Sequence, residues 1–265
     1  MNKKIQFDPI GVFDSGLGGL SILSEIHKQL PQEDIIYLAD SENAPYGKKS
    51  EKEIVDLSIK NTQFLLSKSC KIIVVACNTA TTNAIAILRK KFDTPFIGIE
   101  PAIKPAAIQT KTKQIGILAT KGTLSSQLFF HHANKLRQNT NIIEVVGKGI
   151  VEAIETNTLN SKEFNTKLCK QLEPFLNSDI DHLVLGCSHY PFIISKLKDI
   201  LGEEIKIIDS GFAVARQTRR VLIDNNFQNQ DMTKKRNIKI YTNGTSKQAL
   251  DNILTKLDLR HTTIY

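Results

Sequence analysis

Short apolar runs alternate with longer amphipathic segments along almost the whole chain, and this alternation limits the possible folds more than any other feature. The runs are rich in Val and Ile, which is typical of buried strands. Strands that alternate with helices form mostly parallel sheets, covered by helices on both faces. The predicted fold class is therefore α/β. The predicted strands are 9–13, 35–39, 71–76, 96–99, 114–119, 142–146, 182–186, 205–208 and 238–242.

The segments between these strands have helical periodicity. Leucine and isoleucine recur at three- and four-residue steps between residues 20 and 30. Ser50 and Glu53 have the spacing of a capping box, which predicts a helix that begins there. Further helices are predicted over 79–91, 164–175 and 250–257.

Two strand-then-polar segments of the first half have counterparts in the second half. Residues 10–15 (Ile-Gly-Val-Phe-Asp-Ser) resemble residues 115–120 (Ile-Gly-Ile-Leu-Ala-Thr), and residues 73–78 resemble residues 183–188 at nearly the same offset. Buried strands of any origin look alike, so either pair alone carries little weight. A cysteine at the same place in the second pair favours two related α/β halves.

Composition excludes several classes of protein. The chain has 265 residues, with 35 Lys and Arg against 27 Asp and Glu, and its hydrophobic content of 41% is that of a globular protein. The lysines are scattered, and the densest run, Lys234-Lys235-Arg236, is interpreted as a solvated loop, so we expect no nucleic-acid partner. No apolar run approaches the roughly 20 residues of a membrane span. Four cysteines without a disulfide pattern, and no apolar signal segment, favour the cytoplasm.

Ligands of parallel α/β sheets bind beyond the carboxyl ends of the strands, so functional side chains are expected at these positions. The first strand ends in Asp14-Ser15-Gly16-Leu17-Gly18-Gly19. A dinucleotide fingerprint would need a third glycine at position 21, which is Ser21. The glycines permit a tight turn and a close approach to a small ligand, but they fit a plain loop equally well.

Two of the four cysteines occupy such positions. Cys77 and Cys187 each follow an apolar strand and precede a predicted helix, whose N-terminus stabilises a thiolate. Cys70, before a strand, and Cys169, on the apolar side of a helix, are interpreted as small buried hydrophobic residues. His182 is interpreted as a surface histidine and His131-His132 as a helix face, so we expect no metal site.

Spacing tests exclude some thiol chemistries and leave others open. There is no Cys-x-x-Cys pair, and Leu185 and His189 stand where a nucleophile elbow needs glycines. Cys187 and His189 could still form the dyad of a thiol hydrolase. Alternatively, two cysteines that face each other across a cleft could invert a stereocentre, one removing a proton while the other delivers one. A binding protein for acidic ligands is the third candidate.

Four motifs together resemble those of the bacterial glutamate racemases, which belong to the aspartate/glutamate racemase superfamily. The resemblance covers essentially the whole chain, and the motifs have the order and spacing of that family. They are residues 13–19 (Phe-Asp-Ser-Gly-Leu-Gly-Gly), 45–50 (Pro-Tyr-Gly-Lys-Lys-Ser), 76–80 (Ala-Cys-Asn-Thr-Ala) and 186–191 (Gly-Cys-Ser-His-Tyr-Pro).

The resemblance implies a racemase that interconverts L- and D-glutamate without a cofactor and supplies D-glutamate for peptidoglycan. It implies two similar, pseudo-two-fold-related α/β domains with the site between them, here residues 1–98 with 207–265, and residues 99–206. A homodimer is expected. The implied catalytic residues are Cys77 and Cys187, assisted by Asp14, His189 and Glu152. The implied substrate-binding residues are Asp14, Ser15, Tyr46, Gly47, Asn78, Thr79, Ser188 and His189.

One position departs from the family, which usually has threonine after the second cysteine. Ser188 keeps the hydroxyl and lacks the methyl group, so its rotamer is less constrained. The nearest alternative substrates are aspartate and a hydantoin. The blocks around Tyr46 and Cys187 favour glutamate.

Overall fold

The computed structural model describes residues 5–231, 233, 237–244, 246–259 and 263–264. The first of its two sheets has six strands in the order β10-β9-β2-β1-β3-β4, and every pairing is parallel. Polar turns and helices separate consecutive strands, as the predicted alternation requires. The strands are β1 (Ile10–Asp14), β2 (Ile35–Ala39), β3 (Ile72–Val75), β4 (Phe96–Gly98), β9 (Ile238–Thr242) and β10 (Thr263–Ile264).

The second sheet repeats the order of the inner part of the first. It contains β5 (Gln114–Ala119), β6 (Asn141–Val146), β7 (His182–Gly186) and β8 (Lys206–Ile208). Its order, β6-β5-β7-β8, matches β2-β1-β3-β4 strand for strand, and it too is parallel throughout. The two segment pairs that resemble each other in sequence therefore occupy equivalent strands, β1 with β5 and β3 with β7. Since β8 pairs with β7, the second unit extends two residues past residue 206, the limit predicted from sequence.

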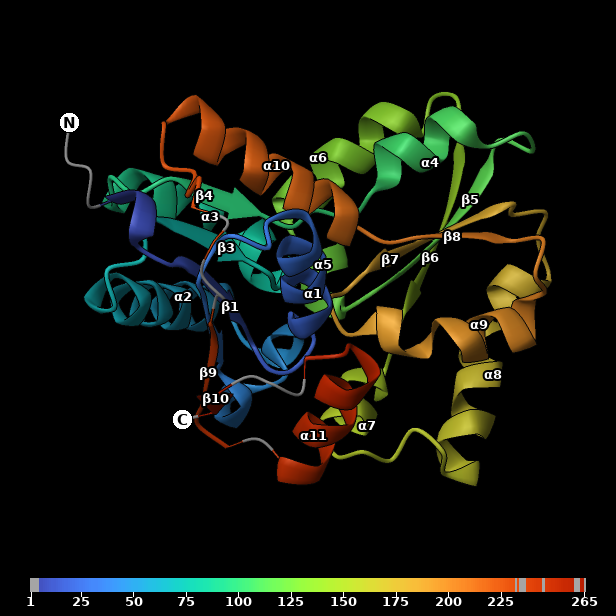
Figure 1. The fold of residues 1–265 in the computed structure, drawn as a ribbon. Helices are drawn as coiled ribbons and strands as arrows, with labels where there is room; N and C mark the ends of the chain where they lie inside the picture. The colour runs from blue at the N-terminus through green and yellow to red at the C-terminus, as the bar shows by residue number, and fades with distance from the viewer. Residues whose placement is uncertain (1–4, 232, 234–236, 245, 260–262, 265) are drawn as a thin grey trace.

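Helices cover both faces of each sheet, and the two sheets form two lobes (Figure 1). Helix α10 follows β8, the last strand of the second sheet. It returns to the first lobe and packs on α1. In the first lobe the helices are α1 (Leu20–Gln29), α2 (Glu51–Ser67), α3 (Asn78–Lys91), α10 (Gly211–Asp224) and α11 (Lys247–Lys256). In the second they are α4 (Ile103–Gln109), α5 (Lys121–Leu124), α6 (Gln127–Leu136), α7 (Ile150–Glu155), α8 (Lys162–Leu176) and α9 (Ile194–Leu201).

One apolar cluster continues from the first sheet into the second. It includes Ile10 and Val12 of β1, Leu17 of the following loop, Ile154 of α7 and Leu185 of β7, all buried. Burial of apolar surface is the main favourable term in folding, so this cluster holds the two lobes together at one edge of the cleft between them. The strand ends that carry the polar motifs lie beside it.

Local signals in the sequence correspond to local structure. Ser50 and Glu53 form the predicted capping box of α2, in which each side chain bonds the other residue's backbone N–H. Short 3-10 turns complete the connections, at Ile5–Phe7, Ser41–Asn43, Tyr46–Lys48 and Tyr190–Ile193. No helix in the described ranges is both long and apolar enough to cross a membrane. The Lys234-Lys235-Arg236 run lies outside the described residues.

Two interpretations of single residues are wrong. His182 is buried, and its Nδ1 lies 2.8 Å from the Asp181 carboxylate, which is itself anchored by Thr110. Cys169 is exposed, because a step of one residue from Leu168 turns its side chain about 100° away from the buried stripe of α8. Cys70 is buried against β1, as predicted.

A buried ion pair fixes the amino ends of the first sheet. Lys71 Nζ lies 2.5 Å from Glu33 Oε2 and donates to the Gln6 carbonyl, while Glu33 Oε1 accepts the Asn229 backbone N–H. Both charged side chains are almost fully buried, at 0% and 1% exposure. The pair therefore joins segments that are far apart in the sequence at a place where neither charge has access to water.

Replacing Lys71 with Met should leave the Glu33 charge buried and uncompensated. We expect the free energy of unfolding, measured by urea denaturation, to fall by about 3–5 kcal/mol. Lys52→Met is the matched control, because Lys52 pairs with Asp56 on the exposed face of α2 and should change nothing measurable. Equal stability of the two variants would show that the buried pair contributes nothing to the fold.

Candidate active site

A small enclosed cavity lies between the lobes, at the carboxyl ends of the equivalent strands β3 and β7. Its volume is about 10 Å³, enough for a single water molecule. Both candidate catalytic cysteines line it, together with most of the predicted substrate-binding residues. The lining residues are Ser15, Pro45, Tyr46, Gly47, Cys77, Asn78, Thr79, Thr120, Val151, Cys187, Ser188 and His189.

Cys77 enters the cavity from the first lobe. It is the N-cap residue of α3, and its sulfur accepts the Ala80 backbone N–H at 3.4 Å and lies 3.7 Å from Ser15 Oγ. Burial, and next the negative charge of Asp14, hold the pKa of the Cys77 thiol well above its ordinary value. The helix N-terminus opposes these effects without outweighing them, so Cys77 is a thiol at neutral pH.

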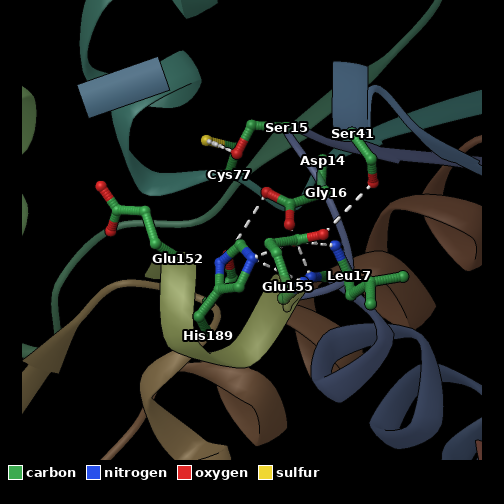
Figure 2. Close-up of polar contacts among 12 residues, drawn as sticks. Asp14, Ser15, Gly16, Leu17, Ser41, Cys77, Glu152, Glu155 and His189 are labelled. Atoms are coloured by element: carbon green, nitrogen blue, oxygen red, sulfur yellow. Dashed lines mark hydrogen bonds and ion pairs between the residues drawn. The ribbon is translucent and has the colours of Figure 1, made fainter. Parts of the chain in front are cut away.

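Cys187 enters the cavity from the second lobe, with His189 beside it. Its sulfur lies 3.8 Å from His189 Nδ1, and the other ring nitrogen, Nε2, lies 2.6 Å from Glu155 Oε1. Burial alone would lower the pKa of His189, but the hydrogen bonds to Cys187 and Glu155 raise it well above its ordinary value. His189 is therefore an imidazolium held between the Cys187 sulfur and the Glu155 carboxylate. Figure 2 shows the contact between His189 and Glu155.

Asp14 connects the two lobes at the base of the site. Its carboxylate accepts the Gly19 backbone N–H at 2.8 Å and the Ser188 hydroxyl at 3.3 Å. Burial raises the pKa of Asp14, and the positive charge of His189 partly opposes this effect. The carboxylate thus acts on Cys77 of its own lobe through its charge, and it accepts a hydrogen bond from Ser188 of the second lobe.

The glycines of the first loop are explained by what lies against them. A side chain at Gly18 would collide with the His189 ring, and one at Gly16 would collide with the Glu155 carboxylate. The loop backbone also binds this carboxylate, since the Leu17 N–H donates to Glu155 Oε1 at 2.6 Å. The loop therefore serves as a close contact surface for the second lobe, a role that neither interpretation of the sequence, a ligand-binding loop or a plain loop, included.

The Asn78 side chain is a buried amide without a partner. Its nitrogen and oxygen are both buried, and neither makes a hydrogen bond with the described residues. Such a group costs about 1–3 kcal/mol unless something bonds to it, and here it lines the cavity. An orphan amide beside two thiols is the arrangement expected of a site that binds a polar ligand.

Hydroxyl groups from both lobes also meet in the lining of the cavity. Thr79 Oγ1 of α3 lies 2.8 Å from Thr120 Oγ1, which caps α5 of the second lobe. Sequence reasoning missed Thr120, although it is the counterpart of Ser15 in the segment that resembles residues 10–15. That correspondence was the signal that could have identified it.

Tyr46 and Gly47 close the cavity from the 3-10 turn after β2. The Tyr46 hydroxyl donates to Asp40 Oδ2 at 2.5 Å and accepts from the Asn61 amide at 3.0 Å. Burial and the Asp40 charge raise the pKa of Tyr46 far above its ordinary value, so it remains a neutral phenol. Gly47 packs against Thr120, where an added Cβ would lie 3.0 Å from the threonine Cβ.

Glu152 lies apart from the group formed around His189. Its carboxylate forms an ion pair with Lys48 Nζ at 2.5 Å, and Figure 2 shows it pointing away from His189. The carboxylate that contacts His189 belongs to Glu155, one turn later on the same helix. The sequence could not indicate which of the two acidic residues of α7 faces inward. The auxiliary role expected for Glu152 stays a prediction.

Among the described residues, no group of three or more His, Cys, Asp or Glu side chains is placed to hold a metal ion. His131 and His132 lie on α6, and His132 faces Glu100 at 3.3 Å.

Comparisons with known proteins agree with this geometry. Residues 10–218 match the Asp/Glu/Hydantoin racemase family. A glutamate racemase of Clostridium perfringens is 40% identical over 95% of this chain and 96% of its own length. One from Herpetosiphon aurantiacus is 45% identical over 81% of this chain and 84% of its own.

Solved structures of the same family have the same fold. A glutamate racemase from Bacillus anthracis superposes with a TM-score of 0.86 at 30% identity, covering 98% of this chain and 97% of that one. The Escherichia coli glutamate racemase, solved with L-glutamate and the activator UDP-MurNAc-ala, has a TM-score of 0.83 at 32% identity, with 97% of each chain covered. With its two parallel sheets, its matched strand ends and these relatives, the chain belongs to the glutamate racemases of the Asp/Glu/Hydantoin racemase family.

Proposed function

We propose that this protein interconverts L- and D-glutamate by direct proton transfer at the α-carbon between Cys77 and Cys187. The observation that carries the proposal is that two thiols, from equivalent positions in two similar lobes, line one cavity. Inversion of a stereocentre needs an acid on one face of the carbon and a base on the other. In this family, the product D-glutamate would serve peptidoglycan synthesis.

The surroundings of the two sulfurs differ, and the difference assigns their starting roles. His189 Nδ1 lies 3.8 Å from the Cys187 sulfur, whereas burial and the negative charge of Asp14 raise the pKa of the Cys77 thiol well above its ordinary value, so that Cys77 starts as the acid. In one direction of the reaction, Cys187 acts as a thiolate and takes the α-proton, while the Cys77 thiol delivers its proton to the opposite face of the α-carbon. After this turnover Cys77 is the thiolate and Cys187 the thiol, which is the state needed for the reverse reaction.

The α-proton of glutamate is a very weak acid, so the site must stabilise the negative charge that develops when it leaves. The Asn78 amide, the hydroxyls of Ser15, Thr79 and Ser188, and the backbone N–H groups at the start of α3 supply fixed dipoles. The same groups can bind the substrate carboxylates. Ser188 keeps this function in spite of the missing methyl group, since its hydroxyl is oriented by Asp14.

The two alternatives from other classes make different use of the same residues. A thiol hydrolase built on Cys187 and His189 would not need Cys77, yet both thiols line the cavity. A protein that only binds acidic ligands would not need two buried thiols with ionisable neighbours. The racemase uses both thiols and the histidine that line the cavity.

Replacement of either thiol should abolish racemisation. We expect Cys77→Ala and Cys187→Ala each to lower kcat by about 10²–10⁴-fold or more, measured by circular dichroism from either enantiomer, with the thermal unfolding temperature little changed. Cys169→Ser is the control, because that thiol is exposed on α8 and should be dispensable. Retention of full activity by either alanine variant would refute the two-thiol mechanism.

Glu155 should determine how far the pKa of the His189 imidazole is raised. Because the hydrogen bond from His189 to Glu155 raises the pKa of the imidazole, Glu155→Gln should lower that pKa. The imidazolium would then be lost at lower pH, and the alkaline limb of the kcat profile should move to lower pH in parallel with the His189 titration followed by NMR.

Glu152→Gln is the matched comparison for this experiment, since Glu152 lies on the same helix but contacts Lys48. It should leave the His189 titration in place. A shift with Glu152→Gln and none with Glu155→Gln would support the auxiliary role predicted for Glu152 and contradict the assignment to Glu155.

A further inference from the structure

The enclosed cavity cannot admit glutamate as it stands. Its volume of about 10 Å³ holds one water molecule, so the walls must part for each substrate and each product. Pro45, Gly47, Thr120 and Val151 form part of these walls, and the same four residues also line a much larger groove of about 600 Å³ on the outside. The groove therefore adjoins the cavity that holds the thiols and shares these four residues with it.

The groove is lined by positive charge. Lys48, Lys49, Lys121 and Lys148 face it, and Glu152 is its one acidic residue among the described lining. Lys48 pairs with Glu152, while the other three lysines make no ion pair within the described part of the chain. Glutamate carries two carboxylates and one ammonium group at neutral pH. Its net negative charge is therefore attracted by the positive charge of this lining.

A second hollow also adjoins the cavity, and its charged residues in the described ranges are acidic. It has a volume of about 300 Å³ and shares Pro45, Val151 and Glu152 with the groove. Its charged residues in the described ranges are Glu152 and Glu155, and no lysine or arginine lies among the described residues that line it, so unlike the groove it offers no cation to attract a dicarboxylate. The charge of the lining residues thus distinguishes the two possible routes to the cavity.

The Lys48–Glu152 ion pair joins two residues that line the groove. Lys48 belongs to the first lobe and Glu152 to α7 of the second, so the pair bridges the cleft at its mouth. The two side chains are 72% and 37% exposed. An exposed pair of this kind is worth at most about 1 kcal/mol, so it can open and close readily as the lobes separate.

We propose that the lysine-lined groove is the route by which the dicarboxylate substrate enters and leaves the thiol cavity, with the Lys48–Glu152 pair as its clasp. This inference rests on the proposed function and adds to it the path of the substrate. Lys121 and Lys148 guide the anion, and Glu152 acts at the mouth of the site.

Neutralising the guiding lysines should weaken capture without changing the chemistry. We expect Lys121→Gln combined with Lys148→Gln to lower kcat/KM and to flatten its decrease with added salt, while kcat stays the same. The charge-matched control is Lys90→Gln combined with Lys91→Gln, at the far end of α3, about 20 Å along the helix from Cys77. Equal effects of the two double variants would overturn the guiding role.

Blocking each approach separately tests the route itself. In a Cys169→Ser background, which lacks the exposed native thiol, a single cysteine is placed in the groove (Ser125→Cys) or in the acidic hollow (Thr156→Cys). Each is labelled with a neutral pyrenyl maleimide in the presence of D-glutamate. We expect the groove label to lower kcat/KM about tenfold or more by obstructing association, and the hollow label to change it less than about twofold.

Equal loss from both labels, loss only from the Thr156→Cys label, or no loss from the groove label would overturn the route. Absence of racemisation in the unlabelled Cys169→Ser enzyme would instead count against the proposed function.

Discussion

The burial of ionisable groups between the two lobes is the constraint on which the rest of the site depends. Asp14, Cys77, Cys187 and His189 are each at most 6% exposed, so their charges can be balanced only by one another and by Glu155. In water the same groups would have ordinary pKa values and would interact weakly. Excluded from water, the Asp14 carboxylate helps to hold the pKa of the Cys77 thiol well above its ordinary value, and the contacts of His189 with Cys187 and Glu155 raise the pKa of its imidazole.

The repeated strand order provides the symmetry that this chemistry requires. Strands β3 and β7 occupy equivalent places in β2-β1-β3-β4 and β6-β5-β7-β8, so their carboxyl ends present equivalent cysteines to one cleft. The neighbours of the cysteines are not equivalent: Ser15 and Asp14 lie near one sulfur, and His189 lies near the other. Similar backbones thus place two similar thiols, and different side chains surround them.

Much of this arrangement could be predicted from the sequence, because strand periodicity and glycine-rich or cysteine-containing strand ends are local signals. All nine predicted strands are present, whereas β10, only two residues long, carries no such signal. The sequence did not identify Glu155, because Glu152 lies three residues earlier on the same helix and only the docking of the lobes decides which faces His189. It misassigned His182 because the burial of that ring depends on tertiary contacts around Asp181.

The central claim is that two sulfurs act on opposite faces of one carbon, and deuterium incorporation early in the reaction tests it most directly. L-glutamate would be incubated with the enzyme in deuterium oxide, and the two enantiomers separated and analysed by mass spectrometry before equilibrium. Two monoprotic bases predict deuterium at the α-carbon of the D-glutamate formed and almost none in the remaining L-glutamate. Equal early labelling of both enantiomers would mean that one group serves both faces, and would contradict the account.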